Sequence, residues 1–107
     1  MSEFYKENLN ILSLDPKTNT KEILLNHWIK KEVYLERQRG RYPEGYFEMS
    51  NRTVAEALGI NTSSVYRTIK KLETLNVIAR VHTAKGKHEK SVYVYKSCEK
   101  RGVSNVL

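Results

Sequence analysis

The apolar positions of residues 50–78 recur at helical spacing, and this stretch predicts two helices joined by a tight turn. Ser50 can cap the first helix, because its hydroxyl can accept a hydrogen bond from a backbone N–H of the first turn. Glycine enters the left-handed conformation without steric cost, so Gly59 marks the end of this helix. The apolar stripe between these two signals consists of Val54, Ala55 and Leu58.

The second helix of the pair has its own start and stop signals. Asn61 or Thr62 can cap its beginning. Asn76 stands where it should stop, in a left-handed position that asparagine fills second only to glycine. Because Ala55 and Gly59 are small, the two helices can cross closely at a steep angle, as in a helix-turn-helix. The inward stripe of the second helix is Val65, Ile69, Leu72 and Leu75.

A long helix is predicted over residues 21–39, ahead of this motif. Its start signal is either Asp15 followed by Pro16, or a capping box of Asn19 with Glu22. Its apolar residues cover more than one stripe. One small domain rarely buries so wide a face, and the surplus therefore predicts a homodimer. These apolar residues are Ile23, Leu24, Leu25, Trp28, Ile29, Val33 and Leu35.

Residues 1–20 form an N-terminal arm that is too apolar for a disordered tail. Two interpretations stay open: the arm packs on its own domain, or it is exchanged with a second subunit. Its apolar residues are Phe4, Tyr5, Leu9, Ile11, Leu12 and Leu14.

Short strands are predicted on both sides of the helix pair. Tyr46 to Met49 follows a glycine- and proline-containing loop and can form a strand that enters the motif. Residues 77–96 are rich in β-branched and aromatic residues at both ends and polar in the middle, around Gly86, which predicts a hairpin with a long basic tip. The hairpin should pair with the strand near Tyr46 and close a small sheet. Residues 97–107 are expected to form a tail or a short docking segment.

These elements define one domain over residues 1–107, mainly α with a small antiparallel β wing. Over residues 21–96 the chain resembles the winged helix-turn-helix DNA-binding family, especially MarR-like regulators and the winged-helix modules of phage and plasmid replication or partition proteins. Asn76 stands where this family usually has glycine. The helix-turn-helix of residues 50–76 and its flank carry the resemblance through Ala55, Gly59, Ile60, Val65, Ile69, Leu72, Asn76 and Ile78.

The positive charge is concentrated in the half that carries the motif. The chain has a net charge of +7. Residues 1–49 hold eight Lys/Arg and eight Asp/Glu, whereas residues 50–107 hold eleven and four, which is the whole surplus of seven. A basic surface that coincides with a DNA-reading motif favours contact with the phosphate backbone.

The candidate DNA-binding residues lie on the second helix of the motif and on the wing. Arg67 is the first choice for base contact, because a guanidinium can bond both acceptors of guanine. Tyr66 can contact a thymine methyl group or a phosphate, and the helix start can bond phosphates. Cations of the hairpin suit phosphate contact or minor-groove insertion. The full set is Asn61, Thr62, Ser63, Ser64, Tyr66, Arg67, Lys70, Lys71, Arg80, Lys85, Lys87, His88 and Lys90.

The sequence predicts no enzyme, cofactor or metal site. His27, His82 and His88 match no zinc spacing. Cys98 is the only cysteine, so an internal disulfide cannot form, and no catalytic elbow or phosphate loop is present. No apolar run reaches the roughly 20 residues of a membrane span, and no secretory signal is found. We therefore expect a cytoplasmic protein.

Three functions are compared for such a chain. The first is a sequence-specific, double-stranded DNA-binding homodimer that acts as a small transcriptional repressor. The second is a plasmid or phage segregation factor, which would coat centromere repeats and recruit a filament-forming partner. The third is a protein-interaction or RNA-binding winged helix, in which replacing Arg67 leaves the affinity for duplex DNA unchanged.

Overall fold

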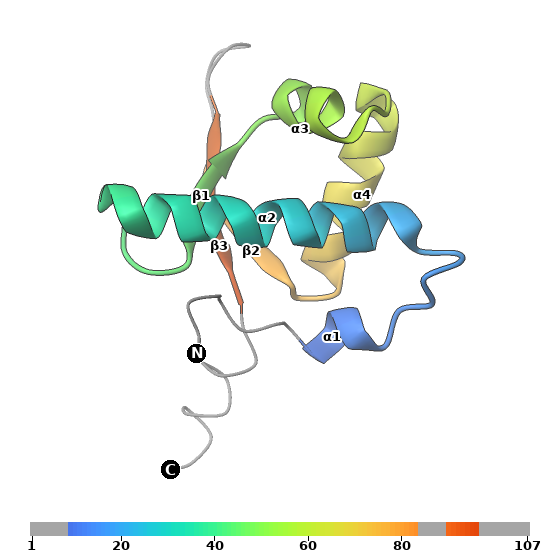
Figure 1. The fold of residues 1–107 in the computed structure, drawn as a ribbon. Coiled ribbons are helices and arrows are strands. Elements are labelled where there is room, and N and C mark those ends of the chain that lie inside the picture. The colour runs from blue at the N-terminus through green and yellow to red at the C-terminus, as the bar shows by residue number, and fades with distance from the viewer. Residues whose placement is uncertain (1–8, 84–89, 97–107) are drawn as a thin grey trace.

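The computed structural model describes residues 9–83 and 90–96. They form four helices and three strands, a mixed α and β fold (Figure 1). The helices are α1 (Leu9–Leu12), α2 (Thr20–Arg39), α3 (Asn51–Leu58) and α4 (Thr62–Thr74), and the strands are β1 (Tyr46–Met49), β2 (Ile78–His82) and β3 (Ser91–Tyr95). Predictions for residues 1–8, most of the hairpin tip and the 97–107 tail lie outside the described residues.

The three strands form one antiparallel sheet in the order β1-β3-β2. The last of the described strands, β3, therefore occupies the centre: Phe47 of β1 faces Tyr93, and Ile78 of β2 faces Tyr95. The register between β2 and β3 shifts between Arg80 and His82. The predicted pairing of the hairpin with the strand near Tyr46 is confirmed.

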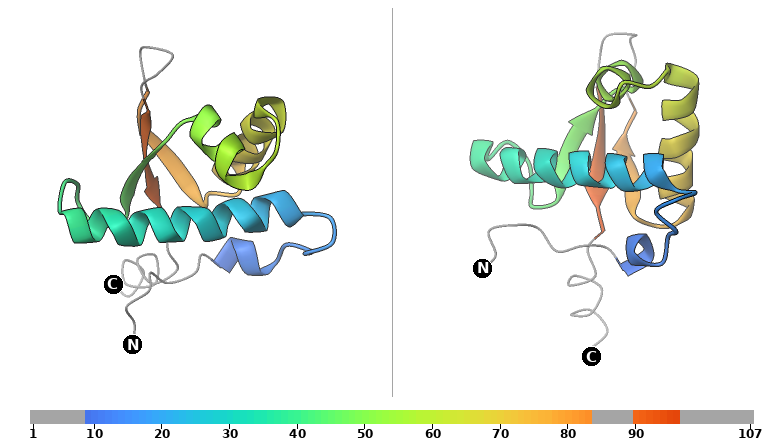
Figure 2. Two further views of the ribbon diagram at one scale, coloured as in Figure 1. Left: turned by 45° about the horizontal axis from the view of Figure 1, so that its top comes forward. Right: turned by 45° about the vertical axis from the view of Figure 1, so that its right-hand side comes forward.

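The hydrophobic core lies where α2 crosses the sheet and continues beneath α4. Figure 2 shows α2 running across the strands, with α3 and α4 beyond it. The face of α2 that contributes most is Leu25, Ile29 and Val33, each at most 2% exposed. The other fully buried side chains are Phe47, Met49, Val54, Val65, Leu72, Val77, Ile78 and Tyr95.

The helix ends follow the predicted capping signals at α3 and α4. Ser50 accepts a hydrogen bond from the Thr53 N–H, and Asn61 accepts one from the Ser64 N–H. Gly59 and Asn76 both have positive φ, at 71° and 63°. The stop signals of the motif are therefore confirmed.

The start of α2 differs from the first of its two predicted signals. Asp15 and Pro16 do not begin a helix, because the backbone after them forms a turn in which the Asn19 N–H donates to the Asp15 carbonyl. The helix starts at Thr20, as the alternative signal at Asn19 implies. The side chain of Asn19 nevertheless makes no capping hydrogen bond, so the predicted capping box does not form.

The described part of the N-terminal arm packs on its own domain. Ile11 is only 5% exposed and belongs to the hydrophobic core. Asn10 donates from its side-chain nitrogen to the carbonyl of Leu75, which follows α4. These two contacts hold α1 beside the end of α4.

The apolar surplus of α2 is partly accounted for within the domain. Trp28 packs against the core, whereas Leu24 remains 46% exposed. The homodimer stays a prediction. Among the described residues, no helix combines the length and apolar composition that a membrane span requires.

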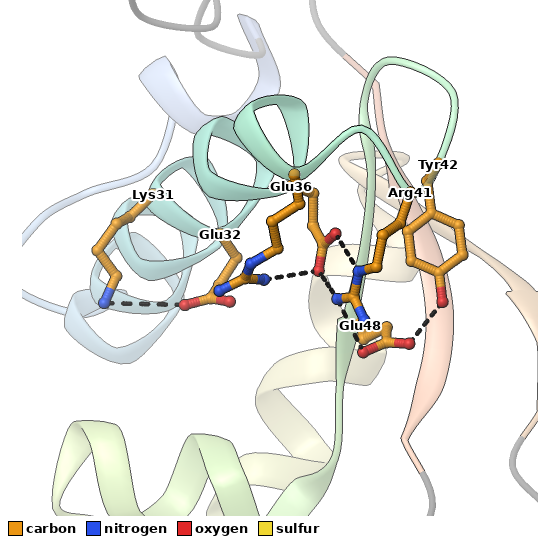
Figure 3. A network of polar contacts seen from close by, with 7 residues as sticks. Lys31, Glu32, Glu36, Arg41, Tyr42 and Glu48 are labelled. Atoms are coloured by element: carbon orange, nitrogen blue, oxygen red, sulfur yellow. Dashed lines mark hydrogen bonds and ion pairs between the residues drawn. The ribbon is translucent and has the colours of Figure 1, made fainter.

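A polar network fastens the end of α2 to β1 (Figure 3). The Glu36 carboxylate is 4% exposed and accepts hydrogen bonds from Arg39, at 2.9 Å, and from Arg41. Arg41 also reaches Glu48 on β1, and the Tyr42 hydroxyl donates to Glu48. Burial raises the pKa of Glu36, but the hydrogen bonds and charges of the two arginines outweigh it, so the pKa lies below its ordinary value.

Candidate nucleic-acid interface

Helix α4 presents one face to the core and a polar face to solvent. The buried side is a double stripe in which apolar residues alternate with hydroxyl groups: Ser64, Val65, Thr68, Ile69 and Leu72. Residues on a helix are about 100° apart, so the opposite side carries the remaining positions. Seven of them are exposed, Thr62, Ser63, Tyr66, Arg67, Lys70, Lys71 and Thr74, and the eighth, Glu73, is partly exposed.

Ser64 does not belong to this outer surface, although the sequence placed it among the phosphate contacts. The residue is 7% exposed. Its backbone N–H is used by the Asn61 cap, and its carbonyl accepts a 2.7 Å hydrogen bond from the Thr68 hydroxyl. Helical periodicity explains the placement, because Ser64 precedes the core residue Val65 and lies one turn before Thr68.

The other predicted residues of α4 lie together at its exposed start and centre. Thr62 and Ser63 occupy the first turn, which carries the partial positive charge of the helix start. Tyr66 is 53% exposed, and the Lys70 ammonium lies 5.8 Å from its ring centroid. Asn61 is exposed, but its side-chain oxygen is used in the cap.

The predicted cations of the β2–β3 hairpin are only partly described. Arg80 lies 3.4 Å from the Glu73 carboxylate of α4 and 5.6 Å from the Tyr93 ring centroid. It is therefore positioned by two neighbours rather than extended into solvent. Lys90 is exposed just before β3. The remaining predicted wing residues, Lys85, Lys87 and His88, lie outside the described residues.

A groove separates the start of α4 from the hairpin. It contains two arginines, Arg52 and Arg80, and several hydroxyl groups that can donate hydrogen bonds. Burial raises the pKa of the Tyr93 hydroxyl, against the opposing charge of Arg80, so this group stays protonated at neutral pH. The lining of this α4–hairpin groove is Met49, Ser50, Asn51, Arg52, Thr62, Tyr66, Arg80, Ser91 and Tyr93.

Five polar members of the groove were not among the predicted DNA-binding residues: Ser50, Asn51, Arg52, Ser91 and Tyr93. Arg52 is largely exposed and makes a 3.5 Å ion pair with Glu56 on the same helix. Arg52 contributes to the positive charge of residues 50–107, but no local sequence signal indicates that it faces the hairpin. Tyr93 and Ser91 reach the groove only because β3 is the central strand, which local sequence signals do not reveal.

Arg67 lies toward the other flank of α4, away from the hairpin. It borders a second hollow with Lys21 and Thr20 at the start of α2. The structure therefore separates two predicted partners, Tyr66 on the groove side and Arg67 on the α2 side, with Ser63 and Lys70 between them.

Comparison with known proteins adds no relative: no protein-family model, curated protein or solved structure matches this chain.

Proposed function

We propose that this protein is a winged helix-turn-helix protein that binds double-stranded DNA in a sequence-specific manner and acts as a small transcriptional repressor. One observation carries the proposal. The capped helix α4 exposes a mainly polar and cationic face, and this face adjoins a groove lined by arginines and hydroxyls that leads to the hairpin. The proposal implies a cytoplasmic protein.

The dimensions of α4 suit the major groove. An α-helix with its side chains is roughly 10–12 Å wide, and the major groove is about 12 Å wide. With its first turns inserted, α4 would bring Ser63, Arg67 and Lys70 against base edges. Tyr66 would then lie toward the hairpin-side backbone. Arg67 remains the first choice for guanine.

The α4–hairpin groove would hold one strand of the DNA backbone. Arg52 and Arg80 supply charge, and the Tyr93 and Ser91 hydroxyls can donate to phosphate oxygens. Such contacts fix the register of the protein without choosing a sequence. The hairpin cations would extend the same contact along the duplex.

A homodimer fits this proposal, because two recognition helices about 34 Å apart contact successive half-sites on one face of the duplex. The exposed Leu24 of α2 is a residue that such an interface would bury. Occupying a promoter suffices for repression, which needs no additional domain.

The experiment is selection of bound duplexes from randomised fragments at near-physiological salt, with wild type, Arg67→Ala and Arg37→Ala. Arg37 is an exposed arginine near the end of α2, so its removal matches the charge change without touching α4. We expect Arg67→Ala to lose about 1–3 kcal/mol of binding free energy, concentrated at one base position. Arg37→Ala should behave as wild type.

The recovered sequences decide between the functions. One inverted repeat supports the repressor, and a tandem array of short repeats identifies the segregation factor instead. Uniform recovery of all fragments would refute sequence-specific binding. Equal behaviour of Arg67→Ala and Arg37→Ala would refute the reading role of α4 and favour a protein-interaction surface.

A further inference from the structure

A hollow lies between the start of α2 and the middle of α4, on the opposite flank of α4 from the hairpin. We call it the α2–α4 notch. Its lining is rich in hydroxyls and cations: Thr18, Thr20, Lys21, Ser64, Arg67 and Thr68. We propose that this notch is a binding site for a phosphate group.

The first donors are the backbone N–H groups at the start of α2. This helix is 20 residues long, and its first intrahelical hydrogen bond runs from the Ile23 N–H to the Asn19 carbonyl. The N–H groups of Thr20, Lys21 and Glu22 precede this bond in the helix and have no intrahelical partner. Asn19 provides no side-chain cap, so these donors and the helix dipole remain available to an anion.

The second observation is the side chain of Ser64, which lines the notch from α4. The residue is 7% exposed, and its hydroxyl makes no hydrogen bond to any residue in the described ranges. Because no fully buried side-chain oxygen or nitrogen in those ranges lacks a partner, this hydroxyl is accessible, and it opens into the notch that the residue lines. A phosphate oxygen in the notch would accept this hydrogen bond.

The other hydroxyls of the notch are already engaged. Thr20 donates to the Pro16 carbonyl, Thr68 to the Ser64 carbonyl, and Thr18 to the Asn19 side chain. The Ser64 hydroxyl is therefore the one in the notch that can still donate a hydrogen bond to a ligand. This distinction makes Ser64 the residue to test.

The charges at the notch favour an anion. Lys21 and Arg67 are both exposed, and neither forms an ion pair within residues 9–83 and 90–96. Glu22 also borders the notch and opposes an anion. The two cations and the helix start outweigh this single carboxylate, and Glu22→Gln should therefore tighten binding.

Two sources could supply the phosphate. Because the notch flanks α4, a backbone phosphate beside the major groove would reach it when α4 is inserted; this source depends on the proposed function. A small phosphate-bearing molecule has the same chemistry and does not depend on it. The two sources are separated by testing free phosphate and duplex DNA independently.

The first arm titrates inorganic phosphate into the isotopically labelled full chain and follows amide chemical shifts by NMR, with chloride at equal ionic strength as reference. We expect phosphate-specific shifts at Thr20, Lys21 and Glu22. Lys21→Gln and Ser64→Ala should each weaken the apparent affinity by about threefold or more. Lys31→Gln, which removes an exposed lysine farther along α2, should not. Absence of phosphate-specific shifts in wild type would overturn the proposal.

The second arm measures affinity for the selected duplex and for a scrambled duplex. If the phosphate belongs to DNA, Lys21→Gln weakens both by a similar factor and lowers the salt slope by about 1. If it belongs to a small molecule, Lys21→Gln weakens phosphate binding as in the first arm and leaves both duplex affinities unchanged. Either result supports the site and assigns its source.

The outcomes also separate this site from the proposed function. If the wild-type protein binds duplex DNA without sequence preference, the proposed function is refuted, while the phosphate titration still tests the notch. Ser64→Ala is checked by thermal unfolding, since the substitution lies in the packed face of α4. If the Ser64→Ala variant does not fold, the test uses Lys21→Gln and Glu22→Gln instead. These two variants should change the phosphate affinity in opposite directions.

Discussion

The hydroxyl of Tyr95 donates a 2.8 Å hydrogen bond to the side-chain oxygen of Asn26, 69 positions earlier in the chain. Both residues are fully buried. This bond joins the central strand β3 to α2 through the hydrophobic core. It therefore fixes how the helix that borders the α2–α4 notch lies against the sheet that carries the hairpin.

Tyr95→Phe should destabilise the fold by about 1–3 kcal/mol, because it removes a buried donor and leaves the Asn26 oxygen without that hydrogen bond. The measurement is the free energy of unfolding in urea. Tyr66→Phe removes the same hydroxyl from an exposed site and should change the free energy by no more than about 0.5 kcal/mol. Equal effects of the two variants would contradict a role for the buried bond.

The carboxylate of Glu36 makes stability depend on pH. The folded state lowers its pKa, because Arg41 and Arg39 outweigh the effect of burial. A group with a lowered pKa contributes stability above its ordinary value, here 4.5, and loses it as the pH falls through the folded-state value. Urea unfolding between pH 7 and pH 3 should show this loss.

Glu36→Gln is the variant that tests the assignment. It keeps the shape of the side chain but removes the charge that both arginines contact. We expect it to be less stable than wild type at pH 7 by about 1–3 kcal/mol and to show a shallower acid dependence. Glu44→Gln, on the exposed loop, serves as the control. An acid dependence identical to wild type in Glu36→Gln would rule out this carboxylate as the cause.

Asn76 has a φ of 63° two residues after the end of α4, and its side chain accepts a 3.1 Å hydrogen bond from Lys96. Asn76→Gly and Asn76→Ala both remove that side-chain bond, so their difference isolates the backbone conformation. We expect the alanine variant to be about 1 kcal/mol less stable than the glycine variant. Thermal and urea unfolding would measure it, and equal stability would show that the left-handed conformation costs nothing here.

Glu73 restrains Arg80, whose guanidinium lies 3.4 Å from it. Under the proposed function, Glu73→Gln should release Arg80 and remove a negative charge beside the duplex. We expect a gain in duplex affinity of about two- to tenfold that is the same for all sequences and fades with salt. Glu44→Gln makes the same charge change away from the interface. A gain of equal size in both variants would indicate a net-charge effect alone.

The local signals of the sequence were sufficient to predict α3, the turn after it and α4. Ser50, Gly59, Asn61 and Asn76 each act within one turn of their own position, and each adopts the expected cap or left-handed conformation. The same holds for the strand at Tyr46–Met49. Asn19 is the exception, because its side chain makes no capping hydrogen bond and the turn after Asp15 engages only the N–H groups of Thr18 and Asn19, which precede the helix.

The candidate site was less accessible to sequence reasoning. Periodicity assigned only the apolar residues of α4 to the interior, so Ser64 and Thr68, which complete the buried stripe with hydroxyls, were not recognised as inward. The groove at Tyr93 depends on strand order, and the notch depends on residues near Lys21 meeting residues near Arg67. These are contacts between distant segments, which local patterns do not encode.

Because β3 lies at the centre of the sheet, it limits how far this domain can fold during its synthesis on the ribosome. While residues 91–95 are still inside the exit tunnel, β1 and β2 have no strand to pair with, because neither pairs with the other. Phe47 and Ile78, both buried in the finished fold, then lack their cover. The nascent chain therefore passes through an open intermediate, with apolar surface available to chaperones or to neighbouring chains, until β3 emerges and closes the core.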